Sequence, residues 1–149
     1  MKLPDGRSSR SRVLLNHGLT IMSTKKEELL LPVLRRLKTS SGGDIEASAV
    51  VTRDGHILVS DMKPGTDVER FSSMCASLFA LAEQSLKEIA IGDMRQVMIM
   101  GGNGMSVLTH AGLDAVLALS TSSKAIQGRV LMESKKTAVE IGRLLGDVQ

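Results

Sequence analysis

Aromatic side chains are almost absent from this chain. Phe71 and Phe79 are the only two in its 149 residues, and there is no Trp or Tyr. Proteins that stack nucleic acid bases present aromatic faces to them, so this scarcity argues against a function of that kind. The core is expected to consist of aliphatic side chains and of the nine methionines.

Cysteine and long apolar runs are equally scarce. Cys75 is the only cysteine, so one chain holds neither a disulfide framework nor a multi-cysteine metal site. A reducing, cytoplasmic setting fits this usage best. No apolar run approaches the roughly 20 residues that cross a bilayer, so we expect no membrane span. The first twenty residues also lack the apolar core of a signal peptide.

The positive charge lies at the N-terminus. Residues 1–23 carry four Lys and Arg against Asp5, which accounts for the whole formal net charge of +3. We expect residues 1–23 to form a disordered basic leader and residues 24–149 to form a single domain; Met22 is an alternative start. Because the domain itself is electrically balanced, its composition gives little support for binding nucleic acid.

Helical patterns alternate with strand patterns along the domain. Thr24 to Glu27 matches a capping box and predicts a helix start at Thr24, while Pro32 predicts a kink, or a true start near Leu31. Two short apolar runs, 45–52 and 57–60, flank an Asp-Gly turn and predict a hairpin. A second capping box, Thr66 to Glu69, then predicts the longest helix over residues 67–90.

That longest helix is apolar over much of its circumference. Its stripe at helical spacing includes Phe71, Cys75 and Phe79, and Met74 and Leu81 widen it beyond what one sheet face requires. We therefore expect the helix to contact more than its own sheet. Three further strands are predicted at 94–100, 105–111 and 115–120, the last of them apolar enough to be covered on both faces. A final helix is expected from residue 125 or 128 to 145.

The predicted order is thus αββαβββα. Five strands with helices on both faces make an α/β fold, a three-layer sandwich around a mostly antiparallel sheet. Strands at the edges of such a sheet leave backbone N–H and C=O groups without partners.

Nothing in the chain matches a catalytic or cofactor pattern. The three histidines, His17, His56 and His110, have no carboxylate or second histidine at ligand or relay spacing. Cys75 lies in an apolar stripe, where it is expected to act as a small hydrophobic residue. The glycine-rich run 101–104 lacks the Lys-Ser/Thr of a phosphate loop, and a strand follows it, so a hairpin turn is the better interpretation. We expect no catalytic residue, no metal and no cofactor.

The predicted third strand is the more informative feature. Alternation places Met94, Gln96, Met98 and Met100 on one face, where the thioethers can be core or can form an adaptable contact surface. The two interpretations are compatible when the strand lies at an edge and pairs with a second copy about a two-fold axis. The expected dimer interface then comprises Met74, Leu78, Leu81, Met94, Gln96, Met98 and Met100.

The segment 44–145 resembles the Roadblock family of dynein light chains and small-GTPase regulators. The resemblance lies in DIEASAVVTRDGHILVSD, the helix VERFSSMCASLFALAEQSLKEI, the strand pair RQVMIMGGNGMSVL and the segment AVLALSTSSKAIQGRVLMESKKTAVEI. It implies a profilin-like fold and a dimer with a joint sheet through the third strands. It also implies that this chain is a non-enzymatic partner of a small Ras-like GTPase, for example a GTPase-activating partner. The resemblance assigns no catalytic residue to this sequence.

A homodimeric module that regulates or scaffolds such a GTPase is therefore expected. The alternative from another class is a small-molecule sensor of profilin-like or PAS-like type, which would require a sizeable pocket with convergent polar groups. An enzymatic function is the least supported hypothesis.

Overall fold

The computed structural model describes the chain over residues 17–147. The order of elements within this range is the predicted αββαβββα. The elements are α2 (His17–Ser40), β1 (Ile45–Thr52), β2 (Ile57–Asp61), α3 (Val68–Glu88), β3 (Gln96–Gly101), β4 (Gly104–Ala111), β5 (Ala115–Thr121) and α4 (Gln127–Asp147).

The five strands form one sheet in the order β2-β1-β5-β4-β3, and every neighbouring pair is antiparallel. Four of the predicted strands differ from these bounds by a residue or two, and β1 has the predicted bounds. β5 lies at the centre and is buried along almost its whole length, as its continuous apolar run indicates. β3 lies at one edge of the sheet.

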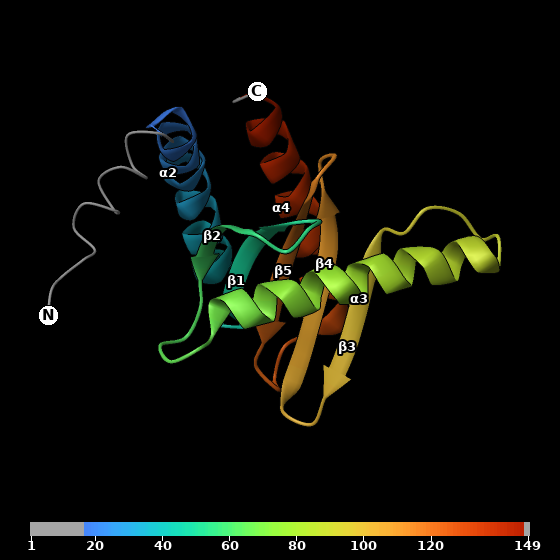
Figure 1. Cartoon of the computed structure of the whole chain (residues 1–149). Coiled ribbons are helices and arrows are strands. Elements are labelled where there is room, and N and C mark those ends of the chain that lie inside the picture. Colours follow the sequence, from blue (N-terminus) through green and yellow to red (C-terminus); the bar gives the residue numbers. More distant parts are fainter. Residues whose placement is uncertain (1–16, 148–149) are drawn as a thin grey trace, which may run out of the picture.

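Helices cover both faces of the sheet, which confirms the predicted three-layer architecture (Figure 1). On one face α2 lies against β2 and α4 lies against β4, and the two helices also contact each other. Leu30, Leu34 and Ile141 belong to the larger hydrophobic cluster on this side. On the other face α3 alone covers the sheet, and Cys75 and Phe79 anchor a smaller cluster there.

α2 differs from its prediction at two points. It begins at His17 rather than Thr24, and it continues through Pro32 instead of starting near Leu31. Pro32 and Glu28, the residue one turn earlier, are both exposed, so water can satisfy the carbonyl that the proline leaves without a donor. Residues 1–16 of the expected basic leader lie outside the described residues.

The start of α3 shows which residue caps it. Asp67 is the N-cap, and its carboxylate accepts a hydrogen bond from the backbone N–H of Arg70 at 3.1 Å. The capping box predicted from Thr66 was therefore wrong by one position. A carboxylate at this place also lies at the positive end of the helix dipole.

Candidate protein interface

β3 presents an open backbone edge. The N–H of His110 donates to the carbonyl of Arg95, and no register shift interrupts the pairing from Gln96↔Thr109 to Gly101↔Gly104. Hydrogen-bonded and non-hydrogen-bonded pairs alternate in antiparallel ladders. The N–H and C=O groups of Gln96, Met98 and Met100 therefore point away from β4, and no described strand lies on that side.

Side chains on the two faces of β3 have different surroundings. Gln96 donates from Nε2 to the Thr109 hydroxyl at 3.2 Å and to the Leu131 carbonyl of α4 at 3.3 Å. Gln96, Met98 and Met100 thus share the face covered by α4. Met98 is 38% exposed and Met100 is 63% exposed, so the end of this strand carries thioethers that its own subunit leaves uncovered.

Met94 departs from the prediction. It does not share a face with Gln96; it is buried at 6% exposure within the cluster under α3. The strand begins only at Gln96, so the alternation of a pleated strand does not extend back to Met94. Within one subunit Met94 is core, and it offers no surface to a partner.

α3 carries the second part of the uncovered apolar surface. Met74, Leu78 and Leu81 are 51%, 41% and 67% exposed, as the wide stripe in the sequence suggested. Sequence reasoning missed Ile99 on β3, and Ile91 in the α3–β3 connection, which are 40% and 66% exposed.

The length of α3 explains this exposure. Its 21 residues make a helix of about 31 Å, whereas five strands span only about 19 Å from the first to the last. α3 crosses the strands, and its C-terminal end extends past β3 (Figure 1). The helix therefore overhangs the open edge, and its last turns have no sheet of their own beneath them.

Contacts along α3 fix it on the sheet. The Ser72 hydroxyl donates to the Gly55 carbonyl in the β1–β2 turn at 2.7 Å. The Arg53 guanidinium pairs with Glu83 and lies 5.4 Å from the centre of the Phe79 ring. These ties hold α3 over β1 and β2, so that the overhang is a fixed feature of the subunit.

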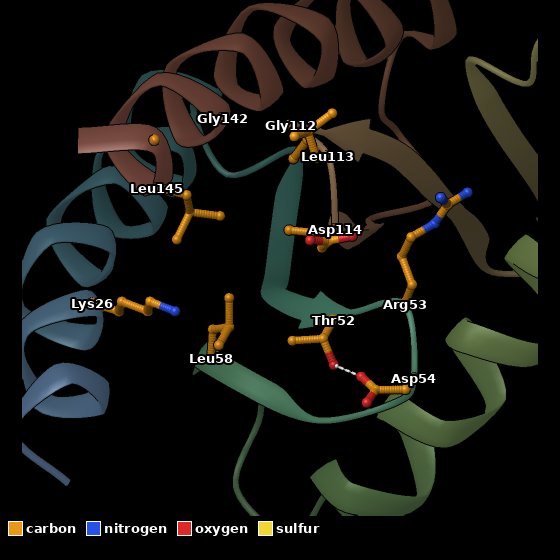
Figure 2. A pocket seen from close by; sticks show the side chains of 13 residues that line it. Lys26, Thr52, Arg53, Asp54, Leu58, Gly112, Leu113, Asp114, Gly142 and Leu145 are labelled. Atoms are coloured by element: carbon orange, nitrogen blue, oxygen red, sulfur yellow. Dashed lines mark hydrogen bonds between the residues drawn. The ribbon is translucent and has the colours of Figure 1, made fainter. Parts of the chain in front are cut away.

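A cavity of about 640 Å³ lies at the opposite end of the molecule, between α2, α4 and two turns (Figure 2). Lys26, Leu58 and Leu145 point into it. Asp114 also lines the cavity. Two other polar lining residues have partners: Thr52 donates to Asp54 at 2.5 Å, and Arg53 is held by Glu83. The Thr52 hydroxyl also lowers the pKa of Asp54. The pairing of Thr52, Asp54 and Arg53 reduces the polar groups that the cavity offers to a ligand, which gives the sensor alternative less support.

The residues considered for catalysis lie apart. His56 is exposed at the hairpin turn, 3.7 Å from Asp54, and the His110 ring packs 5.8 Å from that of Phe79. Burial raises the pKa of the Cys75 thiol to about 11, which keeps the thiol protonated and a poor nucleophile at neutral pH. Across the described residues, no three His, Cys, Asp or Glu side chains are grouped to hold a metal ion.

The glycine-rich run is a hairpin turn, as expected. Gly101 pairs with Gly104 at the end of β3 and the start of β4. Gly104 has a φ of +153°, and a Cβ there would lie 2.2 Å from the Thr121 carbonyl oxygen. The glycine is thus required for a close backbone approach. Within the described range, no helix is both long and apolar enough to cross a bilayer.

A five-stranded antiparallel sheet between one helix and a helix pair defines the profilin-like class of α/β sandwich. Profilin IA of Acanthamoeba castellanii superposes with a TM-score of 0.53 at 15% identity, over 74% of this chain and 97% of its own. Structures of MglB superpose better. MglB in a tetrameric arrangement has a TM-score of 0.75 at 18% identity, over 83% of this chain and 93% of that one. Myxococcus xanthus MglB has a TM-score of 0.73 at 19% identity, over 85% of this chain and 92% of that one.

The family follows from the sequence comparison. The family model of the Roadblock/LC7 domain matches residues 29–121, more than half of the chain. The uncharacterized protein MJ1340 of Methanocaldococcus jannaschii is 31% identical over 109 residues, which are 73% of this chain and 93% of that protein. The chain belongs to the Roadblock/LC7 family, and the resemblance noted in the sequence is confirmed.

Proposed function

We propose that this protein is a non-catalytic homodimeric module that regulates or scaffolds a small Ras-like GTPase in the cytoplasm. The observation that carries the proposal is the open edge of β3 beneath the overhanging end of α3. Both features leave groups uncovered that a second copy of the chain can cover. The GTPase partner comes from the family resemblance, and the single buried Cys75 supports a reducing compartment.

Pairing of two β3 strands explains the uncovered surface. A two-fold axis perpendicular to the sheet makes the strands antiparallel, continues the sheet across the axis and gives partners to the outward groups of Gln96, Met98 and Met100. The overhanging end of α3 from each copy then lies over the sheet of the other. Leu78, Leu81 and Ile99 are on the side of the joint sheet that the overhang covers.

The same assembly leaves a surface for a partner. Two α3 helices lie together on one face of the joint sheet, and their exposed small and apolar side chains, such as Ser77 and Ala80, permit close approach of another protein. In the GTPase-stimulating role that the family resemblance implies, the dimer reshapes the switch region of the GTPase and need not supply an arginine finger. Hence we assign no catalytic residue to this chain.

Assembly is tested first, by a matched pair of charge substitutions. Met98→Asp places two carboxylates near the two-fold axis, and light scattering should then report monomers. Leu113→Asp introduces the same charge at a residue of the β4–β5 turn that is 81% exposed and belongs to neither β3 nor α3, and it should leave the dimer unchanged. A dimeric Met98→Asp protein would argue against the β3 interface.

Regulation is tested by co-purification with the small Ras-like GTPases of the host, loaded with GDP or a GTP analogue, followed by turnover measurements. The wild-type chain should form a nucleotide-dependent complex or alter turnover, and Met98→Asp should reduce either effect. Absence of any complex together with unchanged turnover across the set would refute the regulatory role. Leu113→Asp serves again as the control.

A further inference from the structure

The outer surface of the α2–α4 layer is a separate feature that the proposed function does not use. Residues 25–40 and 127–147, which form this layer, carry nine Lys and Arg against five Asp and Glu, a net charge of +4. Residues 41–126, which form the sheet and α3, carry six Lys and Arg against ten Asp and Glu, a net charge of −4. The fold thus separates charge that looks balanced when the domain is read as a linear sequence.

The four cations of α4 form a basic ridge, which we define as Arg129, Lys135, Lys136 and Arg143. All four are exposed and recur at helical spacing on the side of α4 that faces away from the sheet. Met132 and Val139 lie between them and are 59% and 74% exposed. Glu133 and Glu140 lie three or four residues from Arg129, Lys136 and Arg143, so they border the ridge.

One of the bordering carboxylates is used within the layer. Glu140 pairs with Arg36 of α2 at 2.5 Å, so its charge is directed into the seam between the helices. Glu133, two turns earlier, is on the same side of α4 and is half-buried. Lys135, Lys136 and Arg35 of α2 make no ion pair with any described residue, so their charge faces solvent.

α2 extends the basic surface sideways. Lys25 and Arg35 are exposed on the side of α2 away from the sheet, and the two helices pack side by side. The cations are consequently spread over two neighbouring helices and are not gathered in one cleft. This geometry fits an extended, charged plane better than it fits a single phosphate group.

We infer that the outer surface of the α2–α4 layer docks on an anionic lipid bilayer. Each Lys or Arg near such a surface strengthens binding about fivefold, and the exposed Met132 and Val139 can contact the interfacial region between headgroups. The scarcity of aromatic residues disfavours single-stranded nucleic acid, whose bases stack on aromatic side chains. It also indicates that docking is electrostatic, without the aromatic anchors of an inserted helix.

The proposed dimer would strengthen this docking. A two-fold axis perpendicular to the joint sheet keeps both α2–α4 layers on one side, so two basic surfaces face the bilayer together and the α3 helices face away from it. This doubling rests on the proposed function. The basic surface of a single subunit does not.

The test is co-sedimentation of the full chain with vesicles containing about 30 mol % phosphatidylserine in phosphatidylcholine, a content typical of an anionic leaflet. We compare wild type with a ridge variant, Arg129→Gln/Lys135→Gln/Lys136→Gln. The control variant, Arg70→Gln/Lys87→Gln/Arg95→Gln, removes the same net charge from exposed positions on and after α3. Circular dichroism and light scattering verify that the three proteins share fold and assembly.

The expected loss of vesicle affinity is about 100-fold for the ridge variant, as three factors of about five imply, and less than about 3-fold for the control. Binding should disappear on pure phosphatidylcholine and weaken at about 0.5 M salt because the charges are screened. Equal losses in both variants would show that only net charge matters and would overturn the inference. Unchanged binding of the ridge variant would overturn it as well, by assigning the contact to residues 1–23.

Two further arms separate the alternatives. Poly-glutamate and duplex DNA replace the vesicles, and tighter ridge-dependent binding to either one than to vesicles would overturn the lipid assignment. The monomeric Met98→Asp protein should still bind vesicles through the ridge, only more weakly. Because no GTPase is present, failure of the regulatory proposal would leave this result unaffected, and loss of vesicle binding would leave the regulatory proposal standing.

Discussion

Proline at position 98 removes one backbone donor from the open edge of β3 and leaves the rest of the strand in place. The N–H of Met98 points away from β4, whereas that of Ile99 points toward it in the pair Ile99↔Ser106. Proline is tolerated on edge strands where the missing N–H faces outward. Met98→Pro should therefore preserve the subunit while damaging its pairing with a second copy.

The size of the effect follows from the two-fold symmetry. Each copy loses one donor, so the dimer loses two hydrogen bonds at about 1 kcal/mol each. A loss of about 2 kcal/mol corresponds to a rise of about 30-fold in the dimer Kd. The free energy of unfolding of the monomer should fall by less, because no bond to β4 is lost.

Sedimentation velocity over a dilution series measures the dimer Kd, and urea unfolding measures subunit stability. Met98→Ala is the control for the side chain, since it keeps the N–H. Ile99→Pro is the control for direction, since it breaks the bond to β4 and should destabilise the subunit itself. The reasoning is refuted when Met98→Pro dimerises as tightly as Met98→Ala, or when both proline variants destabilise the subunit equally.

Three further predictions concern the stability of the fold. Gly142→Ala should lower the free energy of unfolding by about 1–3 kcal/mol, because the new Cβ would lie 2.8 Å from the backbone of the β4–β5 turn. The control Gly146→Ala, whose Cβ meets nothing within 4 Å, should raise the free energy of unfolding by up to about 1 kcal/mol. Equal effects of the two substitutions in urea titrations would contradict the close approach at Gly142. Asp67→Ala should lower the free energy of unfolding by about 1 kcal/mol through loss of the N-cap, and Thr66→Ala should lower it by less. A larger effect of Thr66→Ala in thermal unfolding would indicate that Thr66 is the N-cap, as the sequence predicted. Burial raises the pKa of the Cys75 thiol to about 11, so the unfolded chain loses this proton at a lower pH than the folded chain does. The thiol's contribution to the free energy of unfolding is therefore present below about pH 9 and is lost as the pH rises from there to about 11. Cys75→Ala should remove this loss when unfolding is measured from pH 8 to pH 11, and a parallel pH profile in both proteins would contradict the burial.

Much of the architecture was predictable because local signals and burial agree. The Asp-Gly turn fixes the first hairpin, and β1 has the predicted bounds. The continuous apolar run of β5 predicts its place at the centre of the sheet, where both faces are covered. The excess apolar surface of α3 was also visible, since Met74, Leu78 and Leu81 exceed what one sheet requires.

The errors have specific physical causes. Met94 was placed on the wrong face because alternation was extended beyond the point where the strand begins. A helix start near Leu31, one of the two outcomes predicted for Pro32, was wrong because a proline removes only one helical bond, and here that bond faces water. Asp67 and Thr66 are adjacent residues of good capping type, and sequence alone does not decide between them.

The basic surface of the α2–α4 layer was not predictable at all. Its cations come from two helices that are separated by the whole sheet in the sequence, and each helix alone looks like an ordinary solvated face. Their shared position depends on the sheet order, which brings β2 and β4 to the places where α2 and α4 cover them. Summing charge over the chain conceals such a separation.

The two edges of the sheet are unequal, and for the proposed dimer this inequality has a consequence for the size of the assembly. β2 has only five residues, its pairing with β1 contains an irregularity between Val50 and Val51, and α2 rests against it. At β3, by contrast, the pairing with β4 has no register shift, so a second copy finds a regular edge there. In the proposed dimer both β3 edges are used and only the two β2 edges remain, so strand addition would end with a closed pair and would not continue into a fibre.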